Sequence, residues 1–193
     1  MQSARSECRL FFALWPDDAV RLRIAMTAMK GFRDAGNGVR LVPAPNLHLT
    51  LAFLGPVPAE RVDAVRDVAA CVDVASGSLC LDASGGWRKP QVGWLAPGLV
   101  PDALAALERE LWGGLVRLGW RRGQPEFRPH VTVVRKLRHP PAPFAFAPIC
   151  WRYDEFVLCE SVSTRAGVRY DIVDRWGRCR VPGSAISEPG GVE

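Results

Sequence analysis

The chain has 193 residues and a net charge of +5, and hydrophobic residues make up 48% and charged residues 23% of it. These proportions are ordinary for a globular protein, and the length allows one substantial domain or two small lobes that share a core. No apolar run approaches the roughly 18 residues that a membrane-spanning helix needs. The polar residues 1–7 and the short apolar run that Pro16 closes do not resemble a secretory signal, so we expect a cytoplasmic protein without a membrane association.

The cysteines are scattered and include no Cys-x-x-Cys pair, which argues against a zinc cluster and against thioredoxin-type chemistry. Because cytosolic thiols stay reduced, we expect no disulfide framework and expect most cysteines to be small buried residues. The residues concerned are Cys8, Cys71, Cys80, Cys150, Cys159 and Cys179.

The first elements in chain order are a strand, a helix and a second strand. Residues 9–14 form a short apolar strand candidate, and a helix over about 17–30 is predicted by the acidic start at Asp17 and by Leu22, Met26 and Met29 at helical spacing. Residues 39–42 form the next strand candidate. Prolines 43 and 45 then restrict the backbone in front of the following segment.

Residues 46–55, Asn-Leu-His-Leu-Thr-Leu-Ala-Phe-Leu-Gly, read as a buried strand that contains a histidine and a threonine. Successive side chains of a strand alternate between its faces, so His48 and Thr50 share one face. We assign Leu49, Leu51 and Phe53 to the opposite, core-facing side. One histidine in an apolar strand is usually structural, so this segment alone does not indicate a site.

The middle of the chain predicts a helix over about 59–72, strands at 79–83 and 91–95 around a loop at 85–87, and a helix over about 104–118. The last helix carries a leucine stripe shorter than three heptads, which favours core packing over a partner-binding zipper.

The histidine and threonine pattern recurs at residues 127–135, Phe-Arg-Pro-His-Val-Thr-Val-Val-Arg, where His130 and Thr132 share a face. The third histidine, His139, lacks both the threonine and the apolar strand, and we interpret it as structural or exposed. The second motif lies in a basic segment that suits a polyanion or is only a solvated face. Its cations are Arg117, Arg121, Arg122, Arg128, Arg135, Lys136 and Arg138, opposed by Glu126.

A hairpin with strands at 155–160 and 168–173 ends the regular structure, and residues 183–193 have the composition of a disordered tail. We therefore expect one domain over residues 8–182. The order of strands and helices predicts an α+β fold of two similar halves, with two pseudo-symmetric antiparallel sheets around a central cleft, helices outside and one histidine strand in each half.

Two histidines and two threonines that converge on a cleft suit in-line displacement at phosphorus. One neutral imidazole takes a proton from water and one protonated imidazole gives a proton to the leaving oxygen, which an ordinary histidine pKa of about 6.5 permits near neutral pH. The threonine hydroxyls can donate hydrogen bonds to the phosphate oxygens where charge accumulates. Two histidines alone make a poor zinc site, so we expect no metal and no cofactor.

The doubled His-x-Thr motif, the segments 9–13, 46–55 and 127–135, and the late Tyr170 and Trp176 resemble the RNA 2',3'-cyclic phosphodiesterases. These enzymes belong to the two-histidine (2H) phosphoesterases and were long named 2'-5' RNA ligases. The resemblance covers nearly the whole chain, from about residue 9 to residue 176. It implies a bilobed fold and hydrolysis of a 2',3'-cyclic phosphate at an RNA 3' end to a 2'-phosphate. It also implies a reversible ligase activity that joins tRNA halves. We predict no obligate protein partner.

The resemblance assigns His48 as the acid for the 3' oxygen and His130 as the base for water, although the sequence alone allows the reverse. Thr50 and Thr132 would hold the phosphate. The family also uses an arginine five residues after the second histidine, here Arg135, but strand alternation turns it away unless the strand ends or bulges first.

Phe11 or Phe12 corresponds to an aromatic residue that stacks on the terminal base in the family, and a core position explains either residue equally well. Two alternatives to the cyclic phosphodiesterase stay open from the sequence. One is a non-catalytic RNA or nucleotide binder. The other is a phosphodiesterase of the same scaffold that acts on another small cyclic ester or on a 2'-5' linkage.

Overall fold

An eight-stranded antiparallel sheet organises the molecule, with strand order β10-β9-β1-β3-β7-β6-β5 and the short β2 paired with β7. The computed structural model describes residues 7–36, 38–165 and 167–177, so the predicted tail at 183–193 lies outside the described residues. A second antiparallel sheet consists of β4 and β8. The strands are β1 (Glu7–Leu14), β2 (Arg40–Leu41), β3 (Leu49–Pro58), β4 (Gly77–Leu81), β5 (Ala83–Trp87), β6 (Val92–Ala96), β7 (Val131–Arg135), β8 (Ile149–Tyr153), β9 (Glu155–Thr164) and β10 (Gly167–Gly177).

The large sheet has two halves that meet at one residue pair. Strands β10, β9, β1 and β3 form the first half, and β7, β6, β5 and β2 form the second. β3 and β7 pair only at Leu49 and Val131, each of which directly follows a motif histidine. The predicted α+β fold with antiparallel sheets is confirmed, and the junction between its halves places the two histidine motifs next to each other.

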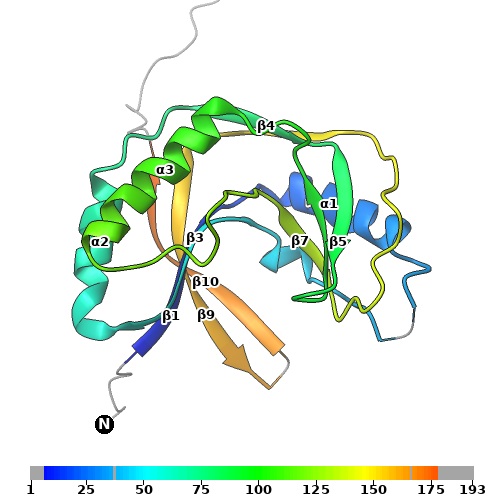
Figure 1. The fold of residues 1–193 in the computed structure, drawn as a ribbon, viewed down its shortest axis with the longest axis horizontal. Helices are drawn as coiled ribbons and strands as arrows, with labels where there is room; N and C mark the ends of the chain where they lie inside the picture. The colour runs from blue at the N-terminus through cyan, green and yellow to red at the C-terminus, as the bar shows by residue number, and fades with distance from the viewer. Residues whose placement is uncertain (1–6, 37, 166, 178–193) are drawn as a thin grey trace, which may run out of the picture.

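Within the described ranges three α-helices cover the sheet, with α2 (Val62–Ala70) and α3 (Asp102–Arg117) at one end of the molecule and α1 (Asp18–Gly31) at the other (Figure 1). Single-turn 3-10 helices, η1 (Ala44–Asn46) and η2 (Ala59–Arg61), precede β3 and α2. The side chain of Asp17 caps α1 by accepting a hydrogen bond of 2.8 Å from the Val20 amide. None of the helices in the described ranges is long and apolar enough to cross a membrane.

The sequence correctly predicted helix α1, but the apolar residues on which that prediction rested lie on its exposed face. Its buried residues are Val20, Ile24 and Ala28. The predicted stripe of Leu22, Met26 and Met29 is instead 57%, 45% and 56% exposed. Both series recur at helical spacing, and the sequence alone did not show which one faces the sheet.

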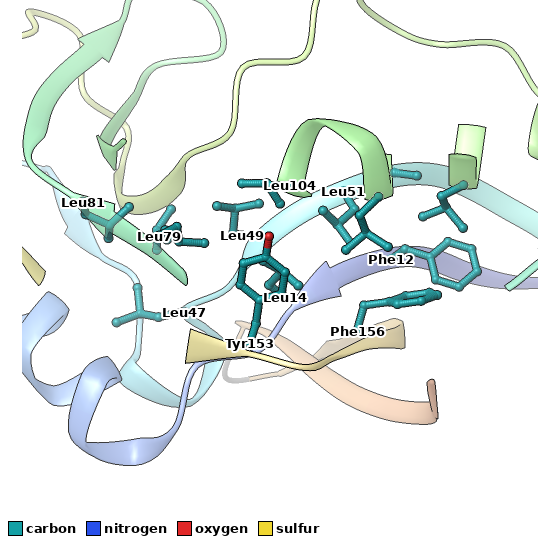
Figure 2. Packing of buried hydrophobic residues seen from close by; sticks show 14 of the residues in the cluster. Phe12, Leu14, Leu47, Leu49, Leu51, Leu79, Leu81, Leu104, Tyr153 and Phe156 are labelled. Atoms are coloured by element: carbon teal, nitrogen blue, oxygen red, sulfur yellow. The ribbon is translucent and has the colours of Figure 1, made fainter. Parts of the chain in front are cut away.

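The core lies between the sheet and the helices. The leucine stripe of α3 is buried at Leu104, Leu107, Leu111 and Leu115, as expected for core packing. Figure 2 shows Leu49 and Leu51 of β3 in the same cluster as Phe12 and Leu104. The side of β3 that carries these leucines is therefore the inner one, and its other side is available for a site.

Bulges interrupt the regular alternation of both histidine strands. Opposite β1, Phe12 pairs with Ala52 and Ala13 pairs with Thr50, so Leu51 is an extra residue in β3. Opposite β6, Gly93 pairs with Val134 and Trp94 pairs with Thr132, which makes Val133 an extra residue in β7. An extra residue reverses the inside and outside assignment of the residues that follow it, up to the next irregularity. Ala52 and Phe53 in β3, and Val134 and Arg135 in β7, therefore lie on the opposite faces from those that simple alternation predicts.

Two further expectations were wrong. The glycine-rich segment at 85–87 belongs to strand β5 rather than to a loop. Cys80 and Cys150 form a disulfide between directly opposed positions of β4 and β8, although no disulfide was expected. The sequence could not indicate this pairing because the two cysteines are 70 residues apart. Among the other cysteines of the described ranges, Cys159 is buried, Cys8 is half-buried and Cys71 is exposed.

Candidate active site

A cleft of about 690 Å³ opens beside the junction of the two half-sheets, and both His-x-Thr motifs line it. His48 and Thr50 come from the start of β3, and His130 and Thr132 come from the start of β7. The structure thus brings together the four residues that the sequence singled out, although the motifs are 82 positions apart in the chain (positions 48 and 130).

Both imidazoles are fixed in the same way by the backbone. Nδ1 of His48 lies 2.7 Å from the carbonyl oxygen of Asn46, and Nδ1 of His130 lies 2.7 Å from the carbonyl oxygen of Arg128. Because a carbonyl only accepts hydrogen bonds, Nδ1 carries the proton in each ring and donates it. In the neutral form Nε2 then carries a lone pair rather than a proton, which is the state that a general base requires. In His48, Nε2 accepts a hydrogen bond of 3.1 Å from the hydroxyl of Thr50.

Aromatic rings enclose His48. The Trp15 ring is parallel to the imidazole, with an interplanar angle of 7° and a centroid distance of 5.5 Å. Phe11 and Tyr170 approach the imidazole at centroid distances of 4.8 and 5.1 Å. His130 has one such neighbour, Trp87, at 4.7 Å. Sequence reasoning missed Trp15 and Trp87, because nothing in their local sequence distinguishes them from core tryptophans.

Both histidines are held in the neutral form. Burial lowers the pKa of His48 to about 4, with smaller contributions in the same direction from the charges of Arg135 and His130, while the Asn46 carbonyl opposes the shift. Burial also lowers the pKa of His130, opposed by its hydrogen bond to the Arg128 carbonyl. Both imidazoles therefore favour the neutral form at neutral pH, and a negative charge beside one of them would favour its protonation.

Arg135 lines the cleft with the two histidines, despite its odd offset from His130. Val133 is the extra residue of a bulge in β7, and this bulge turns the side chain of Arg135 toward the cleft. Its guanidinium is close enough to lower the pKa of His48, so it is placed to attract an anion bound between the imidazoles.

The two phenylalanines expected to stack on a base have different positions. Phe12 is fully buried against Phe156 and Trp176, so base stacking by this residue is wrong. Phe11 lines the cleft but is only 2% exposed, and its ring contacts His48 and Tyr170. We interpret Phe11 as support for His48, since it has almost no free face to offer.

The sequence also predicted the wrong environment for Phe53. It was assigned to the core, but it is 53% exposed and lines the cleft. The extra residue at Leu51 moves Phe53 onto the face of His48 and Thr50. The guanidinium of Arg9 lies over its ring, 5.6 Å from the centroid.

The basic segment of the sequence does not form one surface. Arg122 makes an ion pair with the buried Glu108 at 2.7 Å, and Arg128 pairs with Glu126 at 2.9 Å. Only Arg135 and Lys136 of the segment line the cleft, where Arg9 and Arg40 join them. Within the part of the chain that the structure describes, the residues lining this cleft include four cations and no carboxylate. In the same part of the chain, no three His, Cys, Asp or Glu side chains are grouped as a metal site.

Residues 16–165 match the family model of the 2'-5' RNA ligase superfamily. The chain belongs to this superfamily. An RNA 2',3'-cyclic phosphodiesterase of Escherichia coli K12 is 35% identical over 175 residues, which cover 87% of this chain and 95% of the relative. The apo crystal structure of E. coli LigT superposes with a TM-score of 0.77 at 34% identity and covers 89% of this chain and 97% of LigT. LigT in complex with 3'-AMP has a TM-score of 0.76 at 31% identity, with coverage of 89% and 98%.

Membership of the 2'-5' RNA ligase superfamily agrees with the resemblance seen in the motifs, and the fold of LigT agrees with the predicted fold class. The matched range 16–165 contains both His-x-Thr motifs and Arg135.

Proposed function

We propose that this protein is a metal-independent RNA 2',3'-cyclic phosphodiesterase that opens the cyclic phosphate at an RNA 3' end to a 2'-phosphate. The observation that carries the proposal is the pair of imidazoles, each held by a backbone carbonyl at Nδ1 and each lining one cleft with its threonine. The names of the E. coli relatives support the reaction and the nucleotide ligand. Reversible 2'-5' ligation, for example of tRNA halves, is the same ring opening with an RNA hydroxyl in place of water as the nucleophile.

In the proposed reaction, Nε2 of His130 takes a proton from water and the oxygen of that water attacks phosphorus. The bond between phosphorus and the 3' oxygen breaks, and the protonated Nε2 of His48 gives its proton to that oxygen. Thr50, Thr132 and Arg135 stabilise the charge on the non-bridging oxygens. The products are a 2'-phosphate and a free 3' hydroxyl, and each histidine ends in the state in which the other began.

The low pKa of His48 limits when this residue can act as the general acid, because a general acid must be protonated. Burial favours the neutral imidazole of His48, so in this proposal it acts as an acid only when a bound phosphate supplies negative charge beside it. The cyclic phosphate carries that charge. Substrate binding and protonation of His48 are therefore coupled in this proposal.

The test is to incubate the protein with an RNA that ends in a 2',3'-cyclic phosphate, in EDTA, and to identify the product isomer. A 2'-phosphate product is expected. A 3'-phosphate would reverse the leaving group, and unchanged RNA would favour a non-catalytic nucleotide binder. Turnover of other cyclic or 2'-5' esters, with the RNA left unchanged, would favour a different phosphodiesterase of the same scaffold.

A single domain over residues 8–182 and a location in the cytoplasm belong to the same proposal. The disulfide between Cys80 and Cys150 bears on the location, because cytosolic thiols are normally reduced. Thiol trapping of the protein in intact cells tests it. A reduced pair at positions 80 and 150 is expected in the cytoplasm, and an oxidised pair would indicate an oxidising compartment.

A further inference from the structure

Phe53 presents a large aromatic ring to solvent inside a cleft that is also lined by four cations. The ring is 53% exposed, and Arg9 from β1 lies over it with its guanidinium carbon 5.6 Å from the centroid. Both residues line the cleft of the two histidines. An aromatic ring beside a guanidinium is the combination with which proteins bind the bases of single-stranded nucleic acids.

Phe53 and Arg135 occupy equivalent positions in the two halves of the sheet. Each follows its motif histidine by five residues, and in each strand an extra residue after the threonine returns the side chain to the cleft. Because β3 and β7 are antiparallel and meet only at their first residues, Phe53 and Arg135 lie on opposite sides of the histidine pair. The half of the cleft along β7 thus offers a charge, and the half along β3 offers a stacking surface.

The position of Phe53 suits a neighbour of the reacting nucleotide. Because Leu51 is an extra residue, Phe53 lies two register positions beyond Thr50, which corresponds to about 7 Å along the strand. The cyclic phosphate holds the terminal ribose at the histidines, so the adjoining nucleotide of the same RNA strand reaches this distance. Phe11, which lies closer to His48, is 2% exposed and leaves no comparable free surface.

The charges of the cleft indicate more than one phosphate. Arg135 faces the imidazoles, and the same cleft is lined by three further cations, Arg9, Arg40 and Lys136. A cyclic mononucleotide has one phosphate, whereas an oligonucleotide brings additional phosphates for the additional cations.

We propose that Phe53 and Arg9 form a second base-binding site, which stacks on the base of the nucleotide preceding the cyclic end. The preferred substrate class is therefore an oligoribonucleotide rather than a cyclic mononucleotide. The identity of the substrate in this inference rests on the proposed function. The stacking surface does not, because it follows from the positions of Phe53 and Arg9 in the cleft.

The kinetic test compares a dinucleotide that ends in a 2',3'-cyclic phosphate with the corresponding cyclic mononucleotide. In Phe53→Ala the ratio of the two kcat/KM values falls by roughly five- to a hundredfold, the range expected for one stacked base. Phe53→Tyr keeps the aromatic face and restores most of the ratio. Val116→Ala removes an equally exposed side chain, 53%, from α3 and leaves the ratio unchanged. An unchanged ratio in Phe53→Ala overturns the inference, whether activity falls equally on both substrates or on neither.

A binding measurement separates this inference from the proposed function. The affinity for a fluorescein-labelled tetra-adenylate, measured by anisotropy without turnover, should weaken by a similar factor in Phe53→Ala and not in Val116→Ala. If the wild type cleaves neither cyclic substrate but Phe53→Ala weakens RNA binding, the proposed function fails and the stacking site stands. If Phe53→Ala binds the RNA as tightly as the wild type, the stacking site is wrong.

Discussion

The indole ring of Trp15 stacks parallel to the imidazole of His48, with an interplanar angle of 7° and a centroid distance of 5.5 Å. The stack covers one side of the imidazole, while the Asn46 carbonyl fixes Nδ1. The fold thus sets both the orientation and the protonation state of His48 before any substrate binds. Trp15 in turn has Arg21 at 5.8 Å from its ring, so the stack is anchored to helix α1.

Removing the indole should change how His48 titrates. Burial favours the neutral imidazole and lowers the pKa to about 4, so Trp15→Ala admits water and should raise this pKa by about one unit toward its ordinary value. The pKa is measured by NMR titration of the His48 ring resonances. Trp15→Phe should give a smaller change, and an unaltered pKa in Trp15→Ala would refute the role of the stack.

The cations on the β7 side of the cleft should determine the salt dependence of RNA binding. Each phosphate contact of a single strand contributes about −0.7 to the slope of log K against log salt concentration. Replacing Arg40 and Lys136 together by glutamine should therefore make the slope less steep by about 1.4 for an oligonucleotide. The matched control replaces Arg117 and Arg121, basic residues outside the cleft lining, and should leave the slope unchanged. Equal effects of the two double variants would mean that the cleft cations make no phosphate contacts.

The ion pair of Arg122 with Glu108 should stabilise the fold rather than bind RNA. Glu108 is 4% exposed, and Arg122 donates two hydrogen bonds to its carboxylate, at 2.7 and 3.1 Å. Arg122→Met leaves that carboxylate buried without a partner and should lower the free energy of unfolding by about 3 kcal/mol at pH 8.

The loss should be smaller at pH 5. Burial already raises the pKa of Glu108 against the opposing effect of Arg122, so without Arg122 the carboxyl group protonates more readily as the pH falls. Denaturant titration at the two pH values measures both effects. Arg128→Met breaks an exposed pair and should cost within about 0.5 kcal/mol. A similar small cost for Arg122→Met would show that Glu108 is not buried as a charge.

The disulfide between Cys80 and Cys150 closes a long loop through β5, β6, α3 and β7. Constraining 70 residues in the unfolded chain should stabilise the oxidised protein by roughly 4 kcal/mol. The melting temperature should therefore fall in reductant and in Cys80→Ser, while Cys71→Ser, at a free exposed cysteine, should melt as the wild type does. No shift in reductant, together with no linked peptide by mass spectrometry, would contradict the bond.

The four central residues could be predicted because period-two alternation holds as far as each threonine. His48 with Thr50 and His130 with Thr132 are two residues apart, and no bulge separates them. Beyond the threonines the alternation fails at Leu51 and Val133, and neither residue is a glycine or another recognisable bulge signal. Alternation alone therefore assigned Phe53 to the core, and it turned Arg135 away from the cleft, although both residues line the cleft.

Other features depend on contacts between distant segments. Trp15 precedes α1, and only the pairing of β1 with β3 brings it to His48. On α1, two apolar series compete for the buried face, and packing selects the one that contains Ile24. Such choices are made by the tertiary structure, so the local sequence pattern identified the helix but not its orientation.

The most direct test of the central claim, that His48 and His130 act together as acid and base, is the pH dependence of kcat/KM on a cyclic-ended dinucleotide in EDTA. A bell-shaped profile is expected for the wild type, since one imidazole must be neutral and the other protonated. His48→Ala and His130→Ala should each lower kcat/KM by roughly 10²- to 10⁴-fold and should each remove one limb of the bell. A flat wild-type profile, or full activity in either variant, would contradict the account.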